Sequence, residues 1–279
     1  EPTTPADRWI FSRLAKIVAA VDAAYDNFEF GEITRELYSF VWNEFCDWYI
    51  EFSKARLGAG ADPADRLACQ RNLVFVLDQA LRLLHPIMPF VTEEIWQSLP
   101  HEGESIMISR YPEYDESLVF DGDAEKLENV ISCIRAIRNR RAEMNVPPSK
   151  KAALYVLTSK PQVFTEGEGF ILRLAYADSM TLLDAEPENL NGMVTCATAD
   201  AKLYIPMGQL VDVAKELERI NKELDKARKN LASLEGKLSN ESFVSRAPEA
   251  VVAAERAKAQ KARDLIVSLE ESLKAMQAL

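Results

Sequence analysis

Apolar residues recur three and four positions apart through most of the first 100 residues of this 279-residue chain. That spacing places them on one face of a helix. It predicts helices over about residues 5–25, 33–57 and 63–84, and a short fourth helix around residues 93–99. Thr4-Pro5-Ala6-Asp7 and Asp62-Pro63-Ala64-Asp65 each place a capping side chain before a proline, which is typical of a helix N-terminus. Because the connections are short, we expect an antiparallel helical bundle.

The pattern changes after residue 120. A helix over about residues 123–144 is predicted to end before Val146-Pro147-Pro148, and a second helix is expected near residues 161–176. Between and after these helices lie short segments with the composition of strands. The expected strands are residues 153–157, 180–183, 193–197 and 202–205. This segment therefore predicts a small α+β module.

The last 70 residues have the most regular spacing. Apolar residues from Leu210 to Leu238 alternate three and four apart, as in a coiled-coil seam. A second seam runs from Val252 to Met276, with Glu255 as its one polar position. The break between them predicts an antiparallel hairpin whose first helix is roughly 44 Å long. We thus expect a mainly α chain: a bundle over residues 1–118, the α+β module over 119–206 and a two-helix arm over 207–279.

Charge is unevenly distributed. The chain has 33 basic and 44 acidic residues, a formal net charge of −11, but residues 1–120 hold 20 of the acids against 10 bases. This excludes a wholly basic nucleic-acid coat without excluding local basic patches. No apolar run reaches the roughly 18 residues of a membrane helix. The start at Glu1, without a basic leader or an initiator methionine, suggests a fragment of a longer cytoplasmic protein.

Few residues are available for catalysis or metal binding. The four cysteines form no CxxC pair, so we expect reduced thiols and no metal. The chain has no glycine-rich phosphate loop, HExxH or GxSxG motif, and only 10 glycines. We expect no catalytic residue and no bound cofactor.

The densest basic run lies at the end of the helix predicted over residues 123–144. Arginine forks suit phosphate oxygens, although a solvated helix end is the alternative. We take this run as a surface feature, so Arg138→Ala with Arg141→Ala is expected to weaken binding of a polyanion without unfolding the bundle. The candidate phosphate ligands are Arg135, Arg138, Arg140, Arg141, Lys150 and Lys151.

Two further groups could bind nucleic acid. On the arm, interleaved glutamates equally suit an ordinary solvated coiled coil. In the first segment, aromatic side chains near basic ones could stack unpaired bases, although any one aromatic residue there could instead belong to the core. The arm candidates are Lys222, Lys226, Lys229, Lys237, Arg246, Lys258 and Lys261. The candidates in the first segment are Arg8, Arg13, Lys16, Phe28, Phe30 and Arg35.

Several stretches resemble the C-terminal half of the valyl-tRNA synthetases, which are class I aminoacyl-tRNA synthetases. Residues 84–99, LHPIMPFVTEEIWQSL, are the most recognisable of them. Residues 7–14 and 40–50 are shared with isoleucyl and leucyl relatives, whereas IRNRRAEMNVPP and the terminal hairpin favour the valyl enzymes. The stretches are residues 7–14, 40–50, 84–99, 137–148 and 237–248.

The resemblance implies that the bundle binds the anticodon stem-loop of tRNA-Val and that the arm reaches the outer corner of the tRNA. It also implies a monomer that acts with its own N-terminal catalytic domain, which would join valine to tRNA using ATP and magnesium. The family's two catalytic motifs and its editing domain are absent here, so no catalytic activity is expected of this chain alone. The alternatives are the same region of an isoleucyl relative, a coiled-coil dimerisation module and a stand-alone enzyme.

Overall fold

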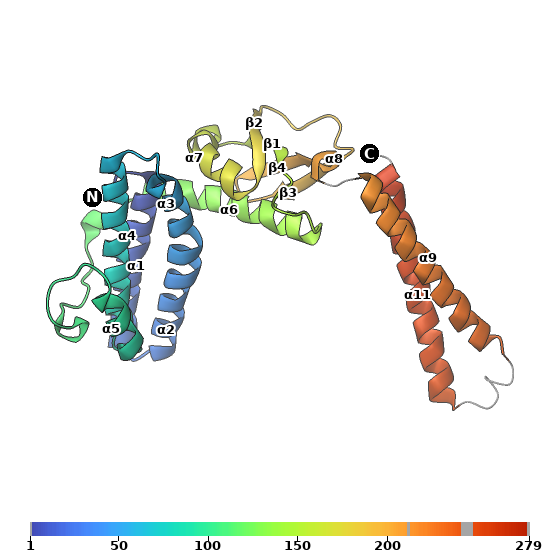
Figure 1. Cartoon of the computed structure of the whole chain (residues 1–279), viewed down its shortest axis with the longest axis horizontal. Coiled ribbons are helices and arrows are strands. Elements are labelled where there is room, and N and C mark those ends of the chain that lie inside the picture. Colours follow the sequence, from blue (N-terminus) through green and yellow to red (C-terminus); the bar gives the residue numbers. More distant parts are fainter. Residues whose placement is uncertain (1, 211–212, 241–247, 278–279) are drawn as a thin grey trace. The chain divides into compact units, whose positions relative to one another are not determined.

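The computed structural model describes residues 2–210, 213–240 and 248–277 (Figure 1). The chain divides into two compact units. The first comprises Glu1–Ser132 with Gln162–Phe170, and the second comprises Cys133–Pro161 with Ile171–Leu279. The boundaries expected after residues 118 and 206 stay a prediction.

The first unit is a bundle of helices, as predicted. Its second helical segment is continuous from residue 30 to residue 57 but has a π-helical centre, which the periodicity did not indicate. The elements are α1 (Pro5–Asp26), α2 (Phe30–Ser39), π-helical η1 (Phe40–Tyr49), α3 (Ile50–Leu57), α4 (Pro63–Leu84), α5 (Pro89–Gln97), the 3-10 turns η2 (Ile106–Ile108) and η3 (Glu116–Leu118), and the first part of α6 (Asp121–Glu143).

The helix starts follow the sequence signals. Thr4 caps α1 by accepting a hydrogen bond from the Asp7 amide at 3.2 Å, while the Asp7 carboxylate accepts one from the Thr4 amide at 3.1 Å. Asp62 caps α4 by accepting a bond from the Asp65 amide at 2.9 Å. Each bond satisfies an amide that has no partner within its helix, which stabilises these ends.

The core of the first unit is formed by the predicted apolar faces. Ile10 and Leu14 of α1 and Leu37 of α2 are fully buried, as is Trp96 of α5. Figure 1 shows α1, α2 and α4 running alongside one another. Burial of apolar side chains of this size contributes about 1.5–3 kcal/mol each, so this interior supplies most of the stability of the unit.

Helix α7 (Pro161–Leu174) contributes residues 162–170 to the first unit, and there Gly167 packs against α6. A Cβ atom added to Gly167 would lie 2.4 Å from Cγ2 of Val130, whereas a Cβ on Gly169 would meet no atom within 4 Å. The β-branched Val130 side chain has little freedom to move aside. The close approach of α6 and α7 therefore requires a glycine at 167 alone.

We expect Gly167→Ala to destabilise the protein by about 1–3 kcal/mol, because the added methyl group overpacks a dense interface. Gly169→Ala is the matched control and should stabilise the same helix by about 0.5–1 kcal/mol. Urea unfolding followed by circular dichroism measures both. Equal effects of the two substitutions would show that the contact with Val130 is not tight in solution.

The second unit contains the predicted α+β module. Its strands are β1 (Ala152–Thr158), β2 (Ala177–Leu183), β3 (Met193–Ala197) and β4 (Ala201–Pro206), and all four match predicted segments. They form one sheet in the order β2-β1-β4-β3. Strands β1 and β2 are parallel and are joined by α7, while the other pairs are antiparallel. The second part of α6 supplies the buried Cys133, Ile134 and Ile137.

The arm consists of α9 (Val213–Leu238) and α11 (Glu249–Gln277), which lie side by side and antiparallel (Figure 1). It follows the short helix α8 (Met207–Leu210) in the chain. The seam positions Leu224, Leu234 and Ala259 are buried, as the heptad pattern predicted. Two ion pairs cross the hairpin at 2.7 Å, Arg228–Glu270 and Arg263–Glu235.

Glu255, the polar position in the seam, is half-buried: its side chain is 13% exposed. It accepts a bond from Lys258 at 2.7 Å and lies 3.9 Å from Lys237 on α9. A carboxylate can occupy a seam position when lysines of both helices compensate its charge.

Across the described parts of the chain, no helix has the length and apolar content needed to cross a membrane.

Candidate nucleic-acid interface

The three basic candidates of α1 are each bound to a carboxylate of another element. Arg8 pairs with Asp123 of α6, and Lys16 pairs with Asp121 at 2.6 Å. Arg13 makes a two-pronged contact with Glu44 at 2.6 and 2.7 Å, which raises the pKa of its guanidinium. A phosphate group that approached these side chains would therefore compete with the protein's own carboxylates.

Phe28 and Phe30, the aromatic candidates, are on the surface: Phe28 is 78% exposed and Phe30 is 57% exposed. Their rings meet edge-to-face at 6.4 Å, and Phe30 makes a similar contact with Tyr25 at 6.2 Å. Phe28 has a backbone φ of 59°, which is strained for a bulky residue. The core alternative is thus wrong for both rings, and they are available for stacking. The exposed Arg35 is bound to Glu32 and Glu36 of its own helix.

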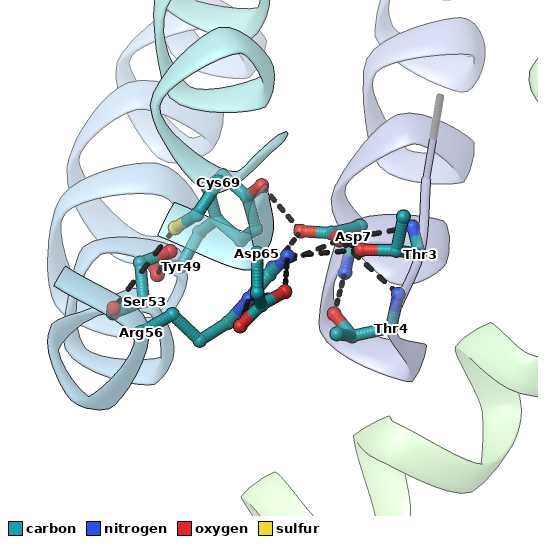
Figure 2. A network of polar contacts seen from close by, with 8 residues as sticks. All are labelled: Thr3, Thr4, Asp7, Tyr49, Ser53, Arg56, Asp65 and Cys69. Atoms are coloured by element: carbon teal, nitrogen blue, oxygen red, sulfur yellow. Dashed lines mark hydrogen bonds and ion pairs between the residues drawn. The ribbon is translucent and has the colours of Figure 1, made fainter. Parts of the chain in front are cut away.

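The residues that position the α1 candidates form a polar network around Asp7, which is fully buried (Figure 2). The Asp7 carboxylate accepts bonds from Tyr49 Oη at 2.7 Å and from Arg56 Nη1 at 2.9 and 3.0 Å. Arg56 also donates to Asp65 at 2.6 Å. The network joins α1, η1, α3 and α4. It therefore holds the start of α1 in place, and with it Arg8, which directly follows Asp7.

Burial would raise the pKa of Asp7, but the Tyr49 hydrogen bond and the Arg56 charge outweigh it and hold the pKa below its ordinary value. Since the folded-state pKa is the lower one, this carboxylate stabilises the fold above the unfolded-state pKa of about 4. That contribution is lost as the pH falls through the folded-state pKa.

We therefore expect the bundle to lose stability below about pH 4. Urea unfolding at a series of pH values measures the loss, and Asp7→Asn is the reference because it removes this titration while leaving the others. A pH dependence that is equally steep in Asp7→Asn would mean that other carboxylates cause the acid loss.

The basic run of α6 is only partly on the surface. Arg141 is 4% exposed and donates to the carbonyl oxygens of Pro147, at 3.1 Å, and Lys150. Its guanidinium lies 5.5 Å from the Tyr176 ring centre, and burial lowers its pKa. We expected Arg141 to lie on the surface, and this expectation is wrong because the side chain is buried. Arg138 is half-buried and donates to the Leu174 carbonyl at 2.7 Å. The exposed members are Arg135, Arg140, Lys150 and Lys151.

Arg141→Ala should therefore destabilise the α+β module by about 1.5–3 kcal/mol, because it leaves two carbonyl groups without a charged donor. Arg140→Ala is the control, since the Arg140 side chain is 46% exposed and pairs only with Glu143 at 2.9 Å among its described contacts. Thermal unfolding of both variants measures the difference. An Arg141→Ala protein as stable as wild type would contradict the structural role.

The arm candidates are spread along both helices and do not form one cluster. Lys222 pairs with Glu218 one turn away at 2.5 Å, and Lys237 and Lys258 flank Glu255. Arg246 lies outside the residues that the structure describes. The exposed basic candidates of the arm are Lys222, Lys226, Lys229, Lys237, Lys258 and Lys261.

Two exposed aromatic side chains of the bundle, Tyr38 and Trp42, were not among the candidates from the sequence. Tyr38 and Trp42 are 62% and 56% exposed, and each follows directly after an apolar residue, Leu37 or Val41, of the helix predicted over residues 33–57. An aromatic residue offset by one from a buried stripe faces the edge of the bundle, and this signal was present in the sequence.

Within the described chain, no group of three or more His, Cys, Asp or Glu side chains is placed to hold a metal ion, and the four cysteines are free thiols.

Comparison with known proteins identifies two segments of the chain. The family described as the anticodon-binding domain of tRNA ligase matches residues 7–156, and the family described as the valyl tRNA synthetase tRNA binding arm matches residues 212–277. The chain is 44% identical to the valine–tRNA ligase of Enterococcus faecalis over 258 residues, which are 91% of this chain and 29% of the relative. It is 42% identical to that of Clostridium acetobutylicum over 273 residues, which are 97% of this chain and 31% of the relative.

The chain thus spans about 30% of the length of the curated relatives that it matches. The two matched segments occur in one chain and in the order that the sequence resemblance implied. The chain belongs to the valyl-tRNA synthetase family, of which it holds the anticodon-binding domain and the tRNA-binding arm.

Proposed function

We propose that this chain is the RNA-recognition part of a valine–tRNA ligase and that it binds tRNA-Val. The observation that carries the proposal is the presence of both RNA-binding segments in one chain that is about 40% identical to valine–tRNA ligases over nearly its whole length. The bundle would hold the anticodon stem-loop, and the arm would contact the outer corner of the tRNA. Phosphate contacts would position the RNA, and base contacts near the anticodon would specify it.

Ligation itself would belong to the remaining part of the enzyme, the N-terminal catalytic domain, with ATP and magnesium as in the family. We further propose that the protein acts as a monomer in the cytoplasm, where tRNA is charged. The arm supports a monomer, because Leu224 and Leu234 of α9 are buried by α11 of the same chain, so its seam is closed without a second copy.

The acidic net charge is compatible with RNA binding when basic side chains are exposed apart from the acids. The exposed lysines of the arm support this arrangement, since α9 and α11 carry them on their outer faces. In the bundle, by contrast, the α1 cations are compensated by Glu44, Asp121 and Asp123. We therefore assign phosphate contacts mainly to the arm, and base stacking to the exposed aromatic side chains of the bundle.

The test is binding of the whole chain to fluorescently labelled tRNA-Val and tRNA-Ile transcripts, measured by anisotropy. Tighter binding of tRNA-Val supports the proposal, whereas tighter binding of tRNA-Ile would support an isoleucyl relative. No binding of either RNA at low salt would overturn the proposal and favour a coiled-coil module. Sedimentation at several concentrations tests the monomer, and a valine-dependent ATP–pyrophosphate exchange signal from this chain would revive a stand-alone enzyme.

A further inference from the structure

The arm is connected to the sheet through α8, a helix of only four residues (Met207–Leu210). A single helical turn is not stable by itself in water, because it cannot offset the cost of its nucleation. Gly208 within it makes the helix still less favourable. Contacts with the rest of the protein must therefore hold α8 in place, and residues on either side of Gly208 make them.

Two hydrogen bonds tie α8 to the α+β module. The Met207 amide donates to the carbonyl oxygen of Gly192, which directly precedes β3, at 2.8 Å. The side-chain oxygen Oε1 of Gln209 accepts a bond from the Ala153 amide of β1 at 2.8 Å. The pairing of β1 with β4 begins only at Tyr155, so the Ala153 amide lies outside that ladder. Gln209 thus takes the place of a strand partner.

One apolar side chain completes the docking of α8. Of the residues of this helix, all of which the structure describes, only Leu210 is buried, with 2% of its surface exposed. The helix lies against β1, while Gly208 and Gln209 are exposed. So small a docked surface can open without unfolding of the module, because few buried contacts are lost. The position of α8 therefore depends on a few identifiable contacts.

Docking of α8 limits where the arm begins. Helix α9 starts at Val213, three residues after Leu210, and its 26 residues give it a length of about 39 Å. With α8 undocked, the chain from Pro206 to Val213 would be a linker whose ends lie about 13–16 Å apart on average. Because the arm is long, a rotation at its start is amplified at its far end. Release of α8 would therefore spread the basic side chains of the arm over a much larger volume.

We propose that α8 positions the arm for RNA binding and that Gln209 and Leu210 are its positioning residues. The inference rests on the proposed function and deepens it, because there the bundle and the arm contact one RNA at two places. The second contact forms at an effective concentration that is set by the segment joining the two binding parts. A docked α8 keeps this concentration high, although neither residue touches the RNA itself.

The test compares two RNAs on the whole chain. A tRNA-Val transcript offers sites for both the bundle and the arm, whereas its anticodon stem-loop lacks the outer corner. Gln209→Met keeps the length of the side chain but removes the oxygen that accepts the Ala153 bond. It should weaken binding of the transcript by about 3- to 30-fold and leave binding of the stem-loop unchanged. Leu210→Ala, which removes the buried contact, should act in the same direction.

Two further variants separate positioning from a general effect of substitution. Gln209→Glu retains an acceptor oxygen and should bind the transcript nearly as wild type does, although its added negative charge opposes RNA binding. Gln162→Met makes the matched change at an exposed glutamine of α7 and should leave binding unchanged. The salt dependence of transcript binding should keep its wild-type slope in Gln209→Met, because the phosphate contacts of the bound state are retained.

Hydrogen exchange of the Ala153 amide, followed by NMR, reports the docking itself. This amide should be protected in the wild-type chain and in Gln209→Glu, and it should exchange faster in Gln209→Met. Thermal unfolding of the two Gln209 variants should stay close to that of wild type, because one hydrogen bond at the surface contributes little to stability. A loss of transcript binding would then not result from unfolding.

The outcomes distinguish this inference from the proposed function. If neither RNA binds the wild-type chain at low salt, both fail. If Gln209→Met and Leu210→Ala bind the transcript as tightly as wild type while the Ala153 amide has lost its protection, the positioning role is overturned and the proposed function stands. Equal losses for transcript and stem-loop would also overturn it, because the effect would not depend on the arm. So would a wild-type chain that binds the transcript no tighter than the stem-loop.

Discussion

Replacement of Arg56 by methionine should cost the bundle about 3–5 kcal/mol of unfolding free energy. The expectation follows from the position of Asp7, which is fully buried and receives two of its hydrogen bonds from Arg56 at 2.9 and 3.0 Å. Without the guanidinium, the carboxylate stays in a low-dielectric interior with its charge uncompensated. Tyr49 and the backbone amides of Thr3 and Thr4 would remain as donors, but they carry no positive charge.

Lys54→Met is the matched control for this experiment, because Lys54 lies on the same helix and forms an ion pair with Glu51 at 2.5 Å. Its side chain is 60% exposed, so the same change should cost less than about 1 kcal/mol. Urea unfolding near neutral pH, followed by circular dichroism, compares the two variants. If Arg56→Met costs no more than Lys54→Met, the Asp7 network does not stabilise the bundle.

An increase in salt from about 50 to about 200 mM should weaken binding of this chain to tRNA by about a thousandfold or somewhat less. This magnitude corresponds to about six phosphate contacts. At each contact a lysine or arginine side chain neutralises a phosphate and releases the counterions that had condensed on it. The exposed lysines of the arm are the side chains to which we assign most of these contacts. Anisotropy titrations at several salt concentrations give the slope.

The slope can be assigned to the arm by a variant in which Lys226, Lys229 and Lys261 are each replaced by glutamine. Every lysine–phosphate interaction that the variant removes should lower the slope by about one and weaken binding to every tRNA alike. Lys54→Gln, which removes an exposed lysine of the bundle, is the control and should leave the slope unchanged. A wild-type affinity that hardly depends on salt would contradict phosphate contacts as the main source of binding.

Much of the architecture could be predicted from local patterns. The helices of the bundle and arm follow from apolar spacing, and the four strands follow from short apolar runs, because each pattern is a property of neighbouring residues. The seam of α9 and α11 is a clear case, since Leu224 and Leu234 were expected to be buried and are. The π-helical turns of η1 could not be predicted, because Val41, Phe45 and Trp48 are four and three positions apart in the sequence, which indicates an α-helix.

The candidate site was harder to predict from the sequence, because the exposure and the ion pairs of its side chains depend on residues far away in the chain. Arg8 lies more than 100 residues from Asp123, so no local pattern indicates their ion pair. Arg141 stands at a helix end in the sequence, but Asn145, with a φ of 53°, reverses the chain and brings the Pro147 carbonyl back to it. The ion pair of Arg8 and the burial of Arg141 therefore depend on a long-range contact and on a left-handed turn, neither of which the local sequence indicates.

The division of α7 between the two units has a consequence for biosynthesis. Phe170 places its ring 4.6 Å from Phe52, and Gly167 packs against Val130, so the first unit lacks part of its interior until residue 170 has been made. By then β1 of the second unit has already been synthesised, while its partners β2 and β4 have not. A chain released from the ribosome before residue 162 would carry both an uncovered aromatic surface and an unpaired strand, which together favour aggregation and recruitment of chaperones.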